Sequence, residues 1–573
     1  MPDSGPTATS GPTGMEAAAT APFDEELLAQ VRPFGTERAV SRGEVLYRAG
    51  DPSPPFVVIL EGESEVVRPG DVAGDGPADP GGGRQEAIVA TRGANGFLGE
   101  LNLLTGQRPY LTARMATDGR VLIVEPDAFR ELMATKPDVS DVVFRAFVAR
   151  RQLLRSGEGA TAIRILGSRY SAEAMALRAF ANRSKVPHTW IDLEDVDDPD
   201  GLLAGIGAKS TDVPIVDTPT ARLLRATPGE FAQHLGLTYQ PIPGFHADLV
   251  VVGCGPAGLA ASVYGASEGL ETVALDGVGP GGQAGASSRI ENYVGFPNGV
   301  SGDDLVGRAA IQAMRLGARL NAPCEVAGLR ASEHGFLEVS LTDGSELVTK
   351  AVIIASGARY RRLEVDDLER FEGAGVYYAA TDLEARVCGG SDVVVVGGGN
   401  SAGQAAIYLA QQGSAVRLVV RRDGLTETMS QYLVARIEAD PRITVLTRTE
   451  VRALAGDTHL ERVTLEHTTS GERSTVGCLG LFCFIGAVPA TGWLCKEIVV
   501  DRSGFVLTDT SLPDEAIHGP AFAGREPLPF ETSVPGVFAV GDVRNGSMKR
   551  VAAAVGEGSS AVRSVHQYLA LHA

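Results

Sequence analysis

The stretch from Asp248 to Ser262 constrains the fold of this chain more than any other. Its sequence, DLVVVGCGPAGLAAS, runs from four apolar residues into a glycine-rich turn and then into an alanine-rich helical pattern. Gly253 permits a tight turn from strand to helix, Gly255 lets the backbone approach a pyrophosphate, and Gly258 allows close packing of helix and strand. The N–H groups at the helix start are then available to phosphates.

An acidic residue follows this motif at the distance that a ribose requires. Asp276 ends the apolar run ThrValAlaLeuAsp, 18 positions after Gly258. A carboxylate at this place accepts a hydrogen bond from a ribose hydroxyl. The alternative is an ordinary glycine-rich turn, which the acidic residue makes less favourable. The sequence therefore predicts a dinucleotide site.

A second glycine turn lies at 392–406, in DVVVVGGGNSAGQAA. The predicted contacts of this turn are Gly397, Gly399, Asn400, Ser401 and Ala402. The next apolar run ends in Arg421 and Arg422, with no acid at its tip. Paired arginines favour a 2′-phosphate over a free hydroxyl, which predicts NADPH at this second site. A solvated surface pair is the alternative interpretation of the two arginines.

The composition limits the class of protein. A chain of 573 residues with 44% hydrophobic residues fits about three to five domains. Its net charge of −20 argues against a nucleic-acid partner. No apolar run of 18 residues predicts a membrane span. We expect residues 1–22, rich in Pro, Gly, Ser, Thr and Ala, to be a disordered tail.

Cysteine usage points to a reducing compartment. No two cysteines form a CxxC pair and none has the spacing of a metal finger, so neither a disulfide framework nor a metal site is expected. We therefore expect a cytoplasmic protein. The six cysteines are Cys254, Cys324, Cys388, Cys478, Cys483 and Cys495.

Residues 23–155 show short apolar and polar alternations followed, after Ile123, by helical patterns, which predicts a small antiparallel β unit with helices. The segment 68–85 is mostly Gly, Asp and Pro and is expected to be a loop. The region resembles the cyclic-nucleotide-binding domain family, a β roll followed by helices. The resemblance is carried by AlaGlyAsp at 49–51, Glu61-Gly62 and FLGELNLLTGQRPYLTA at 97–113.

That resemblance implies a nucleotide site with one departure. Gly99 and its neighbours would offer backbone N–H groups, and Glu100 would accept from the ribose hydroxyl. Pro109 stands where the family has an Arg for the cyclic phosphate. The candidate replacement is Arg108, one residue earlier, whose side chain would leave the chain in a different direction. The ligand would be cAMP, cGMP or another nucleotide. The alternative is a β roll kept for docking or dimer contacts.

Residues 162–238 read as strand, helix, strand and a later apolar run preceded by Val213-Pro214. This order resembles the glutaredoxin and thioredoxin fold, in which a cis proline precedes the third strand. Ser168 and Ser171 occupy the positions of that family's CxxC pair. Because a hydroxyl cannot cycle to a disulfide, we expect this segment to be redox-inactive. An unrelated α/β linker domain is the alternative.

Residues 245–573 carry further motifs: GPGGQAG at 279–285, SRIENYVGFP at 288–297 and VPGVFAVGD at 534–542. Together with both glycine turns, they resemble the low-molecular-weight thioredoxin reductase family. The resemblance implies an FAD domain at 245–364 and 491–573, interrupted by an NADPH domain at 365–490. The implied FAD contacts are Gly253, Gly255, Gly258 and Asp276 for the adenosine half, Gly282, Gln283 and Asn292 toward the ring and ribityl chain, Gly541 and Asp542 at the ribityl chain, and Lys549, Arg550 and Val551 over the ring.

The family's redox pair is missing. In the family, the two cysteines stand in the context GV-x-x-C-A-T-C-D. In this sequence the corresponding segment is GVYYAATDLEA, and the positions aligned with the cysteines are Ala379 and Asp382. Without two thiols, electrons cannot leave by the usual thiolate exchange. Cys388 follows alone and is interpreted as structural.

The expected whole is a multidomain protein with an N-terminal β roll, an α/β thioredoxin-like middle domain and a C-terminal Rossmann-like flavoprotein. The expected function is an NADPH-dependent FAD oxidoreductase that passes electrons to a ferredoxin, a quinone, oxygen or another acceptor that is not a disulfide. Because the cofactors supply the chemistry, we name no catalytic side chain. One alternative is a thioredoxin-disulfide reductase that uses Cys388 or a partner's cysteines, and another is a nucleotide-gated redox sensor. The resemblance also implies a homodimer.

Overall fold

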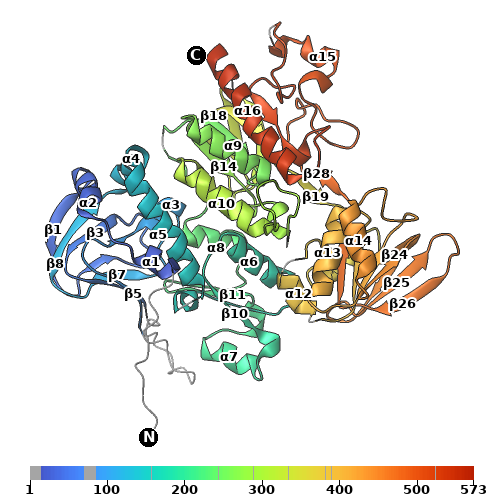
Figure 1. The fold of residues 1–573 in the computed structure, drawn as a ribbon, viewed down its shortest axis with the longest axis horizontal. Coiled ribbons are helices and arrows are strands. Elements are labelled where there is room, and N and C mark those ends of the chain that lie inside the picture. Colours follow the sequence, from blue (N-terminus) through green and yellow to red (C-terminus); the bar gives the residue numbers. More distant parts are fainter. Residues whose placement is uncertain are drawn as a thin grey trace. The chain divides into compact units, whose positions relative to one another are not determined.

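The computed structural model describes residues 14–69, 86–156, 158–242, 244–287, 289–332, 335–380, 382–388, 390–522 and 524–572. These residues form two compact units (Figure 1). The first unit holds the described residues up to 166 and from 185 to 237, and the second holds 167–184 and those from 238 onward. Most of the loop expected at 68–85 lies outside the described residues.

The first unit begins with a roll of two four-stranded sheets, ordered β1-β8-β3-β6 and β2-β7-β4-β5. The pairs β1–β8, β3–β8 and β4–β7 are antiparallel, which confirms the expected antiparallel β unit. Apolar residues alternate along β3 and β8, so that one set fills the space between the two sheets and the other packs against helices α2, α4 and α5. The elements are β1 (Thr36–Val40), β2 (Val45–Tyr47), β3 (Phe56–Glu61), β4 (Ser64–Arg68), β5 (Ala87–Arg92), β6 (Phe97–Leu98), β7 (Thr112–Met115), β8 (Gly119–Val124), α2 (Glu25–Val31), α3 (Glu100–Thr105), α4 (Pro126–Thr135) and α5 (Pro137–Ser156).

The expectation of a disordered tail through residue 22 is wrong for its last part. Gly14–Thr20 forms helix α1, whose sequence GMEAAAT is rich in strong helix formers. Ala19 is buried, and its carbonyl accepts a hydrogen bond from Arg150 Nε at 2.7 Å. A short isolated helix is marginal in water, so this docking stabilises α1 where propensity alone does not.

The rest of the first unit contains a sheet ordered β10-β9-β11-β12. Strand β11 pairs antiparallel with both β9 and β12, and the Val213–Pro214 peptide just before β11 is cis. Helix α6 (Ala172–Arg183) lies between β9 and β10 in the chain but belongs to the second unit. The remaining elements are β9 (Arg164–Gly167), β10 (Thr189–Asp192), β11 (Ile215–Asp217), β12 (Arg222–Leu223), α7 (Pro199–Gly205) and α8 (Pro228–Leu235).

The second unit contains a seven-stranded sheet ordered β15-β14-β13-β18-β17-β16, with β29 beside β18. Strands β13, β14, β15, β18 and β29 run parallel. Helices α9 and α16 pack against each other beside this sheet (Figure 1). The elements are β13 (Ala247–Val252), β14 (Thr272–Leu275), β15 (Arg319–Asn321), β16 (Val326–Ala331), β17 (Leu337–Leu341), β18 (Glu346–Ile354), β29 (Val537–Ala539), α9 (Pro256–Ser267), α10 (Gly302–Arg315), α15 (Asp514–Ile517) and α16 (Val551–Leu571).

A second parallel sheet, ordered β20-β27-β21-β22-β23, is inserted into the first fold. Val393 and Val395 pack toward α13 and α14, whereas Val394 and Val396 face the antiparallel sheet β24-β25-β26. The elements are β20 (Val376–Tyr377), β21 (Val393–Val396), β22 (Val416–Val419), β23 (Ile443–Leu446), β24 (Thr449–Ala455), β25 (Arg462–His467), β26 (Arg473–Gly477), β27 (Gly480–Cys483), α11 (Leu368–Phe371), α12 (Asp382–Cys388), α13 (Asn400–Gln411) and α14 (Gln431–Ala439).

The chain enters and leaves the inserted fold through two paired segments. Strand β19 (Ala358–Tyr360) pairs antiparallel with β28 (Ala487–Pro489). The insertion therefore begins and ends side by side, as a hinged pair of domains requires. These crossings lie close to the domain boundaries expected at 364 and 491.

A buried ion pair stabilises the return to the first fold, before β29. The Glu531 carboxylate is fully buried and accepts from Arg525 at 2.7 and 2.8 Å, from the Leu528 N–H at 2.7 Å and from the Gly536 N–H at 3.0 Å. We expect Glu531→Gln to lower the free energy of unfolding by about 3 kcal/mol, because the Arg525 charge loses its buried partner. Urea unfolding followed by circular dichroism measures this loss.

The matched control is Glu369→Gln, which removes an exposed pair with Arg362. Exposed pairs contribute about 0–1 kcal/mol. Equal effects of the two substitutions would contradict the importance of the buried pair.

Candidate functional site

The first glycine turn joins β13 to α9 and leaves space at its middle glycine. A Cβ on Gly258 would lie 1.7 Å from the Gly253 carbonyl oxygen, so the chain itself requires glycine there. A Cβ on Gly255 would meet only the Gly282 Cα, at 3.9 Å. The chain's own packing thus leaves Gly255 open, which fits the close approach of a ligand pyrophosphate.

Asp276 lies at the end of β14 and organises this turn. One carboxylate oxygen accepts from the Cys254 N–H at 2.7 Å, and the other accepts from the Val278 and Gly279 N–H groups at 2.9 and 2.8 Å. The side chain therefore fixes two loops beside the glycine turn. Its predicted contact with a ribose stays a prediction, because a carboxylate retains lone pairs beyond these bonds.

The residues expected near the flavin ring come from separate loops. Gln283 donates its side-chain amide to the Ala358 carbonyl, and the Gly541 N–H donates to Glu557 at 2.7 Å. Asn292 is exposed, and Arg550 is the exposed residue just before α16, which Val551 begins. Tyr360 is partly buried, and this burial raises the pKa of its hydroxyl to about 12.

Asp542 carries an incompletely satisfied carboxylate. Burial raises the pKa of Asp542, while the ammonium group of Lys549 opposes this shift. No described residue donates a hydrogen bond to this carboxylate; Lys549 instead donates to the Asp542 carbonyl at 2.6 Å. A half-buried acceptor without a donor fits a polyhydroxyl chain such as the ribityl group of FAD.

The second glycine turn repeats this arrangement between β21 and α13. A Cβ on Gly397 would lie 2.4 Å from the Phe484 carbonyl oxygen, and a Cβ on Gly399 would meet nothing within 4 Å. Asn400 forms two hydrogen bonds with Ser430. Its side-chain NH2 donates to the Ser430 hydroxyl at 2.9 Å, and its side-chain oxygen accepts from the Ser430 N–H at 2.7 Å. Ser401 is exposed, whereas Ala402 is fully buried against the sheet.

The two arginines after β22 lie on the surface. Arg421 is exposed, and Arg422 pairs with Glu427 at 3.0 Å. An exposed ion pair contributes little, so a phosphate could take the place of Glu427 at small cost. The residues therefore fit the predicted 2′-phosphate of NADPH.

The inserted fold contacts the first fold near both predicted sites. Arg436 on α14 donates to the two oxygens of Glu291 at 2.9 and 3.0 Å. Ser287, in the loop after Gln283, forms an isolated bridge with Ala380. The position of the missing redox pair therefore adjoins the loop expected at the flavin.

All six cysteines belong to the described residues, and none has the setting of a reactive thiol. Five are buried and Cys495 is partly exposed. Burial raises the pKa of Cys324 to about 11 and that of Cys388 to about 12, and it likewise raises the other four thiol pKa values. Because the thiolate is the reactive form, these cysteines are poorly suited to exchange at neutral pH.

The serines that replace the CxxC pair before α6 have structural bonds. Ser168 Oγ accepts from the Tyr170 N–H at 3.1 Å. Ser171 is the N-cap of α6, accepts from the Ala174 N–H at 3.2 Å and donates to Glu173 at 2.8 Å. Both hydroxyls thus hold the start of the helix.

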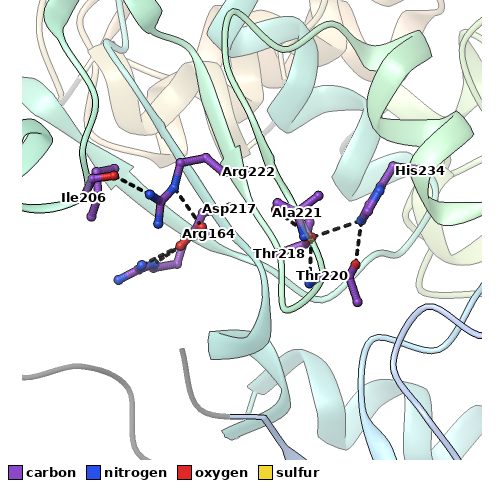
Figure 2. Close-up of polar contacts among 8 residues, drawn as sticks. All are labelled: Arg164, Ile206, Asp217, Thr218, Thr220, Ala221, Arg222 and His234. Atoms are coloured by element: carbon purple, nitrogen blue, oxygen red, sulfur yellow. Dashed lines mark hydrogen bonds and ion pairs between the residues drawn. The ribbon is translucent and has the colours of Figure 1, made fainter. Parts of the chain in front are cut away.

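A polar network at the end of β11 lies among the residues that sequence reasoning did not single out (Figure 2). The buried carboxylate of Asp217 accepts from Arg164 Nε and Arg222 Nε, each at 3.1 Å. His234 lies 3.0 Å from the hydroxyls of both Thr218 and Thr220. Burial, assisted by Arg108, lowers the pKa of His234, so the ring is neutral at physiological pH and the network is structural.

The β roll encloses a cavity of about 350 Å³. Gly99, with φ of +95°, precedes α3 and lines this cavity together with Glu100. Glu100 is buried and accepts from Arg150 on α5 at 2.7 Å. Arg92 on β5 also lines the cavity, so two arginines from outside the predicted cassette reach it.

The predicted contact from Arg108 stays a prediction, and the fold gives it no support. Pro109 lines the cavity, whereas Arg108 does not; its N–H donates to the Leu235 carbonyl of α8 at 2.7 Å. Successive residues of an extended segment point to opposite sides, so a one-residue shift turns the side chain away. No sequence motif indicates Arg92 or Arg150, because both lie outside the cassette.

The described residues hold no group of three or more His, Cys, Asp or Glu side chains arranged for a metal ion. None of their helices combines the length and the apolar character needed to cross a bilayer.

Comparisons with known proteins agree with this geometry. Residues 37–136 match the model of the cyclic nucleotide-binding domain. Thioredoxin reductase from Rickettsia felis is 31% identical over 324 residues, which are 56% of this chain and 97% of that protein. The bifunctional thioredoxin reductase/thioredoxin of Mycobacterium leprae is 31% identical over 327 residues, 57% of this chain and 66% of that protein.

A solved structure shares the fold of the C-terminal part. Thioredoxin reductase from T. acidophilum aligns with a TM-score of 0.51 and 28% identity, over 57% of this chain and 99% of that one. The model of the pyridine nucleotide-disulphide oxidoreductases matches residues 247–558, more than half of the chain. This chain therefore belongs to the pyridine nucleotide-disulphide oxidoreductase family, as an NAD(P)H-dependent flavoprotein oxidoreductase of thioredoxin reductase type with a cyclic nucleotide-binding domain at its N-terminus.

Proposed function

We propose that this protein uses NADPH to reduce bound FAD and passes the electrons to an acceptor other than a disulfide. The observation that carries the proposal is the sulfur-free contact between the two nucleotide folds. Ala380 lies beside Ser287 at the loop expected near the flavin, and the nearby Cys388 is 1% exposed. A thiol relay would need sulfur at this contact in a form that can ionise.

The chain's own residues would bind and orient the cofactors. The open glycines at 255 and 399 admit the two pyrophosphates, and the starts of α9 and α13 direct N–H groups toward them. Asp542 would accept from the ribityl chain, and Lys549 would keep its carboxylate charged. When bound, FAD would accept a hydride from NADPH and hand electrons to the acceptor.

We also propose a fold for the middle domain, a cellular compartment and an oligomeric state. The sheet order β10-β9-β11-β12 and the antiparallel β11 support a thioredoxin-like middle domain. The serines in place of its cysteine pair would make this domain redox-inactive. We further propose a cytoplasmic homodimer without nucleic-acid partners, in keeping with the net charge of −20 and the reduced cysteines.

A regulatory role of the β roll is the second candidate function. The cavity at Gly99 and the backbone bond from Arg108 to Leu235 connect a ligand site with the middle region. A cyclic nucleotide, such as cAMP, is the effector that the matched domain model suggests. A change in NADPH turnover on adding cAMP would support this role, and an unchanged rate would remove cAMP as the effector.

Thiol alkylation tests the proposed electron path. We expect FAD-loaded protein treated with iodoacetamide at pH 7.5, and separately the Cys388→Ser variant, to keep full NADPH turnover with ferricyanide. Because burial raises the pKa of Cys388 to about 12, its reactivity should increase only as the pH rises toward that value. Loss of turnover after alkylation, or NADPH-dependent reduction of thioredoxin, would contradict the proposal.

Cofactor preference tests the two arginines at the second site. We expect Arg421→Gln combined with Arg422→Gln to raise the KM for NADPH about 10- to 100-fold, because charged hydrogen bonds to the 2′-phosphate are lost. The KM for NADH should change little. The control is Arg417→Gln, on β22 just before the two arginines, whose side chain pairs with Asp392 at 2.9 Å. Parallel changes for NADPH and NADH would assign the arginines another role.

A further inference from the structure

We propose that the β-roll cavity binds a small organic anion with an apolar body, and that Arg92 and Arg150, rather than the cassette, hold its charged end. This ligand class differs from the cyclic nucleotide that the domain model suggests. The inference does not rest on the flavin reaction, since the cavity and both arginines lie in the first unit.

Arg150 is nearly buried and has one unused donor. Its side chain is 5% exposed. Nε donates to the Ala19 carbonyl, and Nη1 donates to the Phe97 carbonyl at 2.9 Å and to Glu100 at 2.7 Å. Nη2 is buried without a hydrogen-bond partner among the described residues. A buried donor without an acceptor is costly, so a ligand acceptor there would lower the free energy of the complex.

Arg92 supplies a second unused donor. Its Nη1 donates to the Thr91 carbonyl at 2.6 Å, but Nε is buried and meets no acceptor within the described part of the chain. Burial lowers the pKa of Arg92 to about 10, and the charge of Arg150 contributes to the shift. The two guanidinium groups therefore repel each other in a site of low polarity.

The charges inside the cavity do not balance. Arg92 and Arg150 bring two positive charges, and Glu100 is the one buried carboxylate among the lining residues, since Glu16 is exposed. Burial raises the hydroxyl pKa values of Tyr47 and Tyr110, so both remain neutral. An uncompensated buried charge is unfavourable, and one anion would neutralise the site.

The cassette itself cannot hold a cyclic nucleotide in the way that the family resemblance implies. Glu100, the expected acceptor for the ribose, is paired with Arg150 on α5, which lies outside the cassette. Pro109 has no N–H and no charge, and Arg108 does not line the cavity. The cassette therefore lacks the family's phosphate contact.

The rest of the lining indicates the body of the ligand. It is largely aliphatic, and a volume of about 350 Å³ is at the lower end of small-molecule sites. A carboxylate or a phosphate monoester on an aliphatic or aromatic group combines this body with a charge that a guanidinium binds well. Among the apolar lining residues are Val66, Val89, Leu98, Leu111, Leu153 and Leu154.

Isothermal titration of the full FAD-loaded chain tests the proposal without turnover. Decanoate and phenyl phosphate represent the two anionic heads, inorganic phosphate lacks the apolar body, and cAMP represents the nucleotide. We expect saturable binding of at least one of the first two ligands and weaker binding of inorganic phosphate. Failure of this binding would leave the NADPH reaction untouched, so the two proposals are tested separately.

Three substitutions locate the binding. Arg92→Gln keeps the Glu100–Arg150 pair and should weaken the anion at least about tenfold. Glu100→Gln should keep or strengthen anion binding, because it removes the buried negative charge, whereas a ribose contact would make it weaker. Arg108→Gln is the control and should bind as the unaltered protein does.

Three results would contradict the binding of an organic anion by Arg92 and Arg150. The proposal is overturned if neither decanoate nor phenyl phosphate binds, if their binding survives Arg92→Gln in a folded variant, or if cAMP binds in a manner that Arg108→Gln abolishes. Thermal melting of each variant verifies that it is folded.

Discussion

Close packing of a helix on a strand at residue 258 is the constraint on which the flavoprotein part depends. A Cβ at residue 258 would lie 1.7 Å from the Gly253 carbonyl oxygen, so any side chain there would force the helix away from the turn. At the second turn Ala402 stands at the corresponding position, and the shared close approach is at the first glycine: a Cβ on Gly253 would lie 2.3 Å from the Ala355 carbonyl oxygen, and one on Gly397 would lie 2.4 Å from that of Phe484. These contacts direct two helix N-termini toward the carboxyl ends of two parallel sheets, and the middle glycine of each turn remains open for a phosphate.

Sulfur is absent from the places where the thioredoxin reductase plan and the thioredoxin plan would use it. Ala379 and Ser168 occupy cysteine positions of the two motifs, and the cysteines that remain have raised pKa values because they are buried. The two substitutions act on the same step, the transfer of electrons to a disulfide, while the nucleotide turns are retained. This combination favours a different acceptor over loss of the enzyme.

The sequence was sufficient where the physics is local. Glycine positions, apolar runs and the order of strands predicted both nucleotide folds and the β roll, because sterics and periodicity act over a few residues. It failed where the outcome depends on distant partners. Helix α1 is stabilised by Arg150, which lies more than a hundred residues away, and the cavity of the β roll is lined by Arg92 and Arg150, which the cassette motif does not include.

In the candidate sites, too, local motifs were predicted from the sequence, whereas contacts between distant residues were not. Asp276 was predicted to contact a ribose, and its bonds to three backbone N–H groups could not be read from spacing. Arg92 and Arg150 carry no motif at all; only the closed roll brings them together around Glu100. Family motifs describe the ligand contacts of relatives, whereas the balance of buried charge in this chain depends on its own residues.

The central claim is that FAD is the one redox centre of this chain. Anaerobic titration of the FAD-loaded protein with NADPH, followed by flavin absorbance, counts the electrons that the protein accepts. The account predicts complete bleaching with one NADPH per bound FAD. A requirement for two NADPH would reveal a second two-electron centre, such as a disulfide, and would contradict it.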